Sequence, residues 1–259
     1  MLGLGNGLCQ TAIRRAVSAA PSGWTPAALG SALALWLDAE DAASITLNGS
    51  TVAQWNDKSG NNRHVSQATT ANQPTYNLTG FNSKPALDWG TAFNVRSLFR
   101  TGMTGYSPVR YFGVADYDGP DPFPGYHGLV THNFTSGRDL ISVAPVGSGQ
   151  NWDDFGSLGN SYFLNGSTTS SQVALPTISA PFVFATDFAQ NENRSDLFIG
   201  NDRLAAQRGW RGKISEVIAV NTLPSTADRQ RLEGYLAWKW ALEANLPADH
   251  PFRNSPPTV

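Results

Sequence analysis

Two polar stretches of this 259-residue chain hold oxygen-bearing side chains of the kind that bind calcium. Residues 55–64 read WNDKSGNNRH and contain Asp57 and Asn61, and a later acidic loop contains Asp116 and Asp118. Calcium prefers carboxylate and carbonyl oxygens, although neither stretch has the spacing of a calcium-binding helix–loop–helix. Asp, Ser and Asn around a glycine also close tight turns by bonding to their own backbone. We interpret residues 55–64 as a turn, with calcium as the alternative at all four residues.

Two further stretches combine aromatic rings with polar side chains, which is the chemistry of a sugar site. One contains Trp152, Asp153 and Asp154, and the other ends at Tyr126 and His127. An aromatic face packs against the C–H side of a sugar, while carboxylates and amides bond to its hydroxyl groups. The alternative is that these aromatic residues cover the rim of the hydrophobic core. We take these five residues as candidates for glycan binding.

Residues that would indicate an enzyme are absent from the sequence. Glycosidases need two carboxylates facing one cleft. Glu216 has no second acid nearby on its predicted strand, and Asp38 lies where a strand gives way to a turn. The chain also lacks a nucleophile elbow and a glycine-rich phosphate loop. We therefore predict no catalytic residues.

Composition narrows the class of protein. Charged residues make up 15% of the chain, against an average of about 25%, and the net charge is -2. This balance argues against a nucleic-acid-binding surface, and no apolar run is long enough to span a bilayer. The single cysteine, Cys9, excludes an intrachain disulfide. The first residues lack the pattern of a secretory signal, so we expect no export by that route.

Short apolar runs bounded by turn residues predict an all-β chain. Expected strands are residues 34–38, 85–89, 109–114, 140–143, 182–186, 197–199 and 214–220. Asn165-Gly166 is typical of a two-residue hairpin turn. The one strong helix follows Ser225, a capping residue, and places Leu232, Leu236 and Trp240 on one face.

The first 28 residues differ from the rest of the chain. After a glycine-rich start, Leu8, Ile13 and Val17 recur at helical spacing and form an apolar stripe. We expect residues 1–28 to be an attachment segment and residues 29–255 to be one domain.

Motifs at both ends of that domain resemble a known family. WLDAED (36–41), the stretch 55–64 and ANQPTY (71–76) are similar to the start of LamG-like jelly-roll domains of the bacteriophage and bacterial type, within the concanavalin A-like lectin/glucanase superfamily. GKISEVI (212–218), EGYLAWKW (233–240) and LPADHPF (246–252) are similar to their closing motifs. Residues 100–200 match no motif. The resemblance implies an antiparallel β-sandwich of jelly-roll type with a C-terminal helix.

The same resemblance suggests a place for the protein. We expect a surface protein of a bacteriophage particle, such as a fibre, spike or decoration protein, that attaches to other virion proteins through residues 1–28 and binds host-surface polysaccharide. A homo-oligomer is expected because virion positions are symmetric. A purely structural virion protein and a glycan hydrolase with unfamiliar catalytic residues are the alternatives. No nucleic-acid or membrane partner is expected, and calcium is the one possible cofactor.

Overall fold

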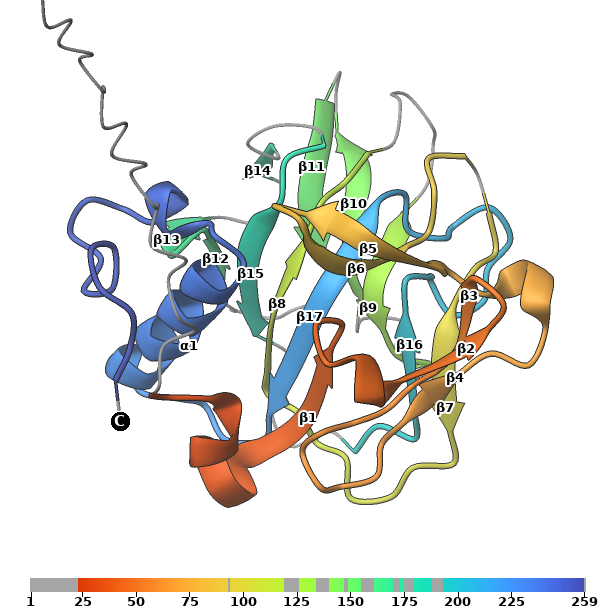
Figure 1. Cartoon of the computed structure of the whole chain (residues 1–259), viewed down its shortest axis with the longest axis horizontal. Helices are drawn as coiled ribbons and strands as arrows, with labels where there is room; N and C mark the ends of the chain where they lie inside the picture. The colour runs from red at the N-terminus through yellow and green to blue at the C-terminus, as the bar shows by residue number, and fades with distance from the viewer. Residues whose placement is uncertain are drawn as a thin grey trace, which may run out of the picture.

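In a computed structural model, the chain folds as an antiparallel β-sandwich with one C-terminal helix (Figure 1). The structure describes residues 23–92, 94–118, 126–133, 140–146, 149–154, 161–169, 173–174, 179–187 and 193–258. The all-β prediction is confirmed, and each of the seven expected strands overlaps an observed one. None of the helices in these ranges has the length and apolar character to span a bilayer.

The first layer of the sandwich is buried on both faces. Its strands are β12 (Tyr162–Leu164), β15 (Phe182–Asp187), β8 (Arg110–Ala115), β17 (Lys213–Val220) and β1 (Leu33–Asp38), with β13 (Ser167–Thr169) paired to β12. Alternate side chains point to opposite faces. Tyr111 and Val217 therefore enter the core between the layers, while Phe112 and Ile218 face the helix.

The second layer forms the other wall of the core. Its strands are β2 (Ile45–Asn48), β3 (Thr51–Trp55), β4 (Val65–Ser66), β7 (Leu98–Thr101), β16 (Asp196–Ile199), β9 (His127–Thr131), β10 (Leu140–Val146), β11 (Gly149–Asp154) and β14 (Val173–Ala174). The hairpin β5 (Thr75–Phe81) and β6 (Lys84–Asp88) joins the layers, because β5 pairs with β3 and β6 with β17. Leu98, Leu129 and Leu197 meet the first layer in one buried cluster.

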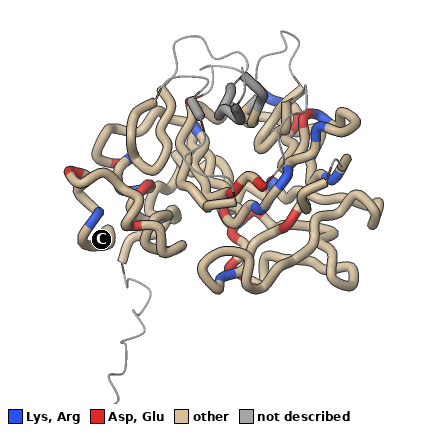
Figure 2. The backbone as a smooth tube through the Cα atoms, turned by 90° about the horizontal axis from the view of Figure 1, so that it is seen from above, with Lys and Arg blue, Asp and Glu red and all other residues tan. Residues whose placement is uncertain are grey.

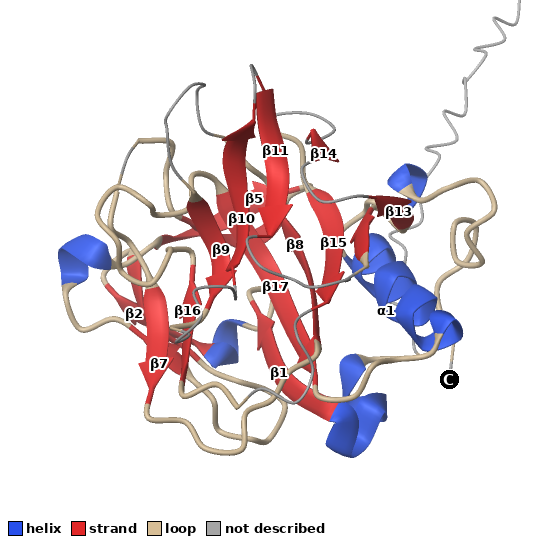
Figure 3. Ribbon diagram, turned by 180° about the vertical axis from the view of Figure 1, so that it is seen from behind, coloured by secondary structure: helices blue, strands red, loops and turns tan. Residues whose placement is uncertain are grey.

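The helix α1 (Thr226–Lys239) covers the outer face of the first layer (Figure 3). Ser225 caps it as predicted, since its Oγ accepts a hydrogen bond from the backbone N–H of Asp228 at 3.1 Å. Leu232, Leu236 and Trp240 are buried against the sheet, which confirms the predicted apolar face. Short 3-10 helices lie at Pro26–Ala32, Ala42–Ser44, Thr70–Asn72 and Glu243–Asn245.

The turn chemistry read from the sequence is also observed. Asn165 and Gly166 adopt positive φ angles of 50° and 78° between β12 and β13, as a two-residue hairpin turn requires.

Residues 57–63 cover the open edge of β1. β17 pairs with one edge of this strand, and the loop bonds to backbone groups on the other edge. The Trp36 N–H donates to Asp57 Oδ1 at 2.9 Å, and the Trp36 carbonyl accepts from the Lys58 N–H at 2.8 Å. Asn61 Nδ2 and Arg63 Nη1 donate to the carbonyls of Leu33 and Ala34 at 2.9 and 2.6 Å.

Candidate functional site

The structure brings two candidate segments predicted from the sequence, 116–118 and 126–127, to one end of the sandwich. The Tyr117 ring contacts the rings of His127 and Trp210, with centroid distances of 5.8 and 5.1 Å. Trp210 Nε1 in turn donates to the backbone carbonyl of Asp116 at 2.9 Å. The segments 116–118 and 126–127 therefore lie together against the loop 200–212, which connects β16 to β17.

The loop 200–212 contains none of the candidate residues predicted from the sequence. It nevertheless supplies the charged groups of the site. We call Tyr126, His127, Asp202, Arg203 and Arg208 the rim cluster. The carboxylate of Asp202 is fully buried and pairs with Arg203 Nε and Arg208 Nη1, each at 2.6 Å. The Arg208 guanidinium lies 5.8 Å from the centre of the Tyr126 ring. One buried acid thus holds two arginines beside a half-buried aromatic ring.

The loop sits directly on β9. A Cβ atom at Gly128 would lie 2.5 Å from the backbone of Asn201 and Asp202, so this strand position has no room for a side chain. Thr131 Oγ donates to the Asn201 carbonyl at 2.8 Å and accepts from the Arg203 N–H at 3.2 Å. These contacts fix the loop backbone on either side of Asp202.

His127 is a neutral member of the rim cluster. Its Nδ1 lies 3.0 Å from the Gly209 carbonyl, so this nitrogen carries the proton and donates. Burial lowers the pKa of His127 to about 4, and the positive charges of Arg211 and Arg208 act in the same direction. The imidazole is therefore uncharged at neutral pH.

Asp116 and Asp118 have protein partners at the same end. Asp116 accepts from the Lys213 backbone N–H at 2.5 Å and pairs with Lys213 Nζ at 3.0 Å. Burial raises the pKa of Asp116, although Lys213 opposes the shift. The carboxylate of Asp118 accepts a hydrogen bond from Ser179 Oγ. A calcium ion at Asp116 would have to displace the lysine ammonium.

Asp57 and Asn61 serve the loop that contains them. Asp57 accepts from the backbone N–H groups of Trp36, Ser59 and Arg63 and from Ser59 Oγ, at 2.8–2.9 Å. The side-chain amide of Asn61 donates to the backbone carbonyls of Leu33 and Ala34 on β1. These bonds are the turn chemistry that the sequence favoured. Within the described ranges, no group of three or more His, Cys, Asp or Glu side chains is placed to hold a metal ion.

Trp152, Asp153 and Asp154 lie in β11, and their side chains fall outside the described part of the structure. The backbone register pairs Trp152 with Val143, and Val143 with His127. The two groups of glycan candidates therefore lie two strands apart in one layer, roughly 10 Å between backbones. Leu8, Ile13 and Val17 are outside the described residues.

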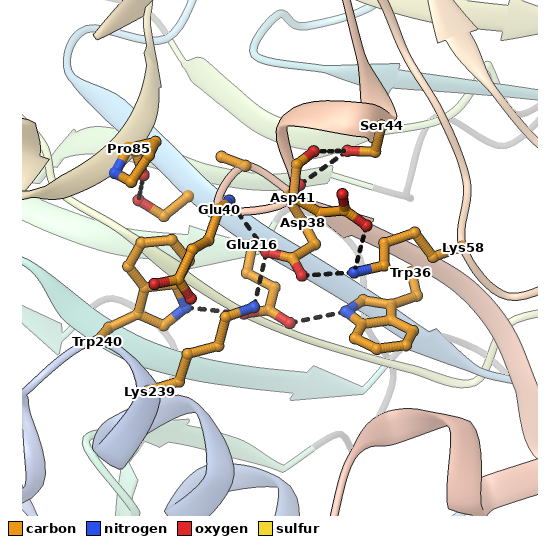
Figure 4. Close-up of polar contacts among 12 residues, drawn as sticks. Trp36, Asp38, Glu40, Asp41, Ser44, Lys58, Pro85, Glu216, Lys239 and Trp240 are labelled. Atoms are coloured by element: carbon orange, nitrogen blue, oxygen red, sulfur yellow. Dashed lines mark hydrogen bonds and ion pairs between the residues drawn. The ribbon is translucent and has the colours of Figure 1, made fainter. Parts of the chain in front are cut away.

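A second polar cluster lies under the helix, and Figure 4 shows how it converges on Glu216. Glu216 is opposite Asp38 across β17 and β1, and the ammonium of Lys239 contacts both, at 2.6 Å to Asp38 and 2.9 Å to Glu216. Glu216 also accepts from Trp36 Nε1 and Trp240 Nε1, each at 2.7 Å, and from the Tyr235 hydroxyl at 3.0 Å. The sequence did not pair these two acids.

Charges in this second cluster are balanced within the protein. Burial raises the pKa of Glu216, although Lys239 opposes it. Burial would also raise the pKa of Asp38, but Lys239 and Lys58 outweigh it, and this pKa is lowered. Because Glu216 is fully buried and its oxygens bond to indole, phenol and ammonium donors, this cluster is a structural junction between helix and sheet.

No protein-family model matches the chain, and no curated protein matches it significantly. Among solved structures, it is similar to a GH54 α-L-arabinofuranosidase soaked with a cyclic sulfate inhibitor, at 12% identity and a TM-score of 0.46. That match covers 73% of this chain and 51% of the other, so the chain spans about half of the arabinofuranosidase. A family 35 carbohydrate-binding module from Clostridium thermocellum matches at 13% identity and a TM-score of 0.26, covering 71% of this chain and 97% of the module. Likenesses this distant transfer neither a ligand nor an activity to this chain.

Proposed function

We propose that this chain is a glycan-binding β-sandwich module and that the rim cluster is its binding site. The observation that supports this most directly is the half-buried Tyr126 ring beside the fixed guanidinium of Arg208. Sugar sites combine an aromatic face with polar groups that bond to hydroxyls, and both are present here on a braced loop. The imidazole of His127 is buried, and its hydrogen bond to the Gly209 carbonyl helps to hold the loop.

The test is binding of the purified chain to a glycan array and to host-envelope polysaccharide. We expect Tyr126→Ala to weaken binding about tenfold or more, because the ring contributes apolar area for the sugar and also contacts the guanidinium of Arg208. Leu78→Ala is the matched control, since Leu78 is exposed on β5, outside the rim cluster. Trp152→Ala tests whether β11 extends the site. Binding that survives both aromatic substitutions would place the site elsewhere.

We further propose that the module is carried on the surface of a bacteriophage particle. This part is supported by the resemblance at both ends of the domain. Residues 1–28 would contact other virion proteins, but Trp24 is buried against Tyr235 of the helix, 5.9 Å between ring centres. A deletion of residues 1–22 is therefore the sharper test. We expect a folded domain that no longer joins its particle; a truncated chain that still assembles would contradict the attachment role.

A purely structural virion protein is the alternative, and the same experiments separate it. A chain that joins its particle through residues 1–22 but binds no polysaccharide would have this role.

A further inference from the structure

Two arginines of the rim cluster present unused hydrogen-bond donors. Asp202 contacts only Nε of Arg203 and only Nη1 of Arg208. Among the described residues, the remaining guanidinium N–H groups of both side chains have no hydrogen-bond partner. The two side chains are 28% and 38% exposed, whereas Asp202 is fully buried. A ligand approaching from solvent therefore meets donors and not the acid that orients them.

The charges in this cluster do not cancel. Arg203 and Arg208 carry two positive charges, and Asp202 supplies one negative charge between them. His127 adds none because it is neutral, and Lys213 beside the cluster is balanced by Asp116. Within the rim cluster one positive charge is therefore left, on two side chains that a buried acid orients through one nitrogen each. Figure 2 shows basic and acidic residues interspersed over the rest of the described backbone.

The loop holds this arrangement in a strained conformation. Arg203, Leu204 and Gln207 have positive φ angles of 52°, 60° and 64°. A left-handed conformation is unfavourable for a residue with a side chain, and such residues concentrate at binding and active sites. Here the Asp202 ion pairs and the contacts with Gly128 and Thr131 hold the loop in place. Fixed guanidinium groups lose little conformational entropy when a ligand binds.

A guanidinium fork matches a carboxylate better than it matches a hydroxyl group, because two parallel N–H groups meet two oxygens. On this geometry, and resting on the proposed glycan-binding function, we propose that the ligand is an acidic polysaccharide. Arg203 and Arg208 bind the carboxylate of a uronic acid unit, and the Tyr126 ring packs against the face of a sugar ring.

The experiment compares a panel of oligouronates, built from galacturonate, glucuronate or mannuronate, with the same oligosaccharides after reduction of each carboxyl to a hydroxymethyl group. Calorimetric titration of the full chain is the readout. We expect at least one oligouronate to bind at least tenfold more tightly than its reduced form, since a charge-assisted bidentate bond is worth about ten- to a hundredfold in affinity. Rising salt concentration should weaken binding of the oligouronate and leave binding of the reduced form unchanged.

Matched variants locate the effect. Arg208→Ala and Arg203→Ala should each lower affinity for the oligouronate about tenfold or more. Arg208→Lys keeps the positive charge but loses the two parallel N–H groups of the guanidinium, and its affinity for the oligouronate should fall almost as far. Arg231→Ala is the control, because Arg231 is 39% exposed and pairs with a surface acid, Asp228, on the helix. Urea unfolding of each variant shows whether lost binding reflects a lost fold.

Three outcomes would overturn the inference. Equal affinity for an oligouronate and its reduced form would remove the acidic requirement but leave glycan binding intact. Dextran sulfate binding as tightly as the best oligouronate would show attraction to charge without a carboxylate site. Binding of neither form of any oligosaccharide, on the panel or on the glycan array, would instead remove the proposed function itself.

Discussion

At the scale of single residues, Glu216 shows how a fold motif arises from side-chain chemistry. The opening motif supplies Trp36 and Asp38, and the closing motifs supply Glu216, Tyr235, Lys239 and Trp240. All six meet in one hydrogen-bonded cluster under the helix. The two ends of the domain therefore depend on each other, which explains why the motifs identify a fold without identifying a ligand.

Glu216→Ala tests that dependence. Removing the acid leaves two buried indole N–H groups and the Tyr235 hydroxyl without their acceptor, and it leaves the buried ammonium of Lys239 with Asp38 as its one remaining acid in the described part of the chain. We expect the free energy of unfolding to fall by about 3–5 kcal/mol. Urea denaturation at neutral pH measures the change. Glu40→Ala is the matched control, because the Lys84 and Glu40 side chains of this pair are 31% and 38% exposed and the pair should contribute less than about 1 kcal/mol. Equal effects of the two substitutions would contradict the junction.

At the scale of elements, the loop 57–63 depends on the Asp57 carboxylate. We expect Asp57→Ala to lower the free energy of unfolding by about 2–4 kcal/mol, because three backbone N–H groups lose their acceptor. Excess chelator should leave the melting temperature of the native chain unchanged. Asn56→Ala is the nearby control, since among the described residues the Asn56 side chain accepts only from Gln54. A melting temperature that falls with chelator and recovers with added calcium would establish the metal instead.

Elements with a local signal were predictable, whereas the assembled site was less so. β17 and α1 follow from hydrophobic periodicity, and the Asn165-Gly166 turn follows from two residue types. Pairing of Asp38 with Glu216 depends on strand register between residues far apart in the chain, which no local pattern records. The loop 200–212 was overlooked because Asp202, Arg203 and Arg208 look like an ordinary solvated run. Its one available signal was the close spacing of arginines and glycines around a single acid.

At the scale of the whole molecule, two buried histidines make stability depend on pH. Burial lowers the pKa of His127 to about 4 and that of His132 to about 3, while the unfolded chain titrates near 6.5. Below pH 6.5 the unfolded state binds more protons, so stability falls as the pH drops from about 6.5 toward 4 and 3. Above 6.5 these two groups should contribute no slope.

Urea unfolding at a series of pH values measures this effect. We expect a loss on the order of a few kcal/mol between pH 6.5 and 4, and His127→Gln should reduce the slope in that window. A free energy of unfolding that stays constant between pH 6.5 and 4 would show that the two imidazoles take up protons in the folded chain as they do in the unfolded chain.

The covered edge of β1 limits how copies of this chain can associate. An open strand edge recruits a strand from another molecule, and the backbone groups that would do so on β1 already bond to residues 57–63. Growth of one continuous sheet from molecule to molecule is therefore blocked at this edge. A symmetric assembly that uses this side of the domain has to be held by contacts between side chains. Such contacts can form a closed oligomer, and neighbouring copies can lie at high local concentration without adding strands to one another.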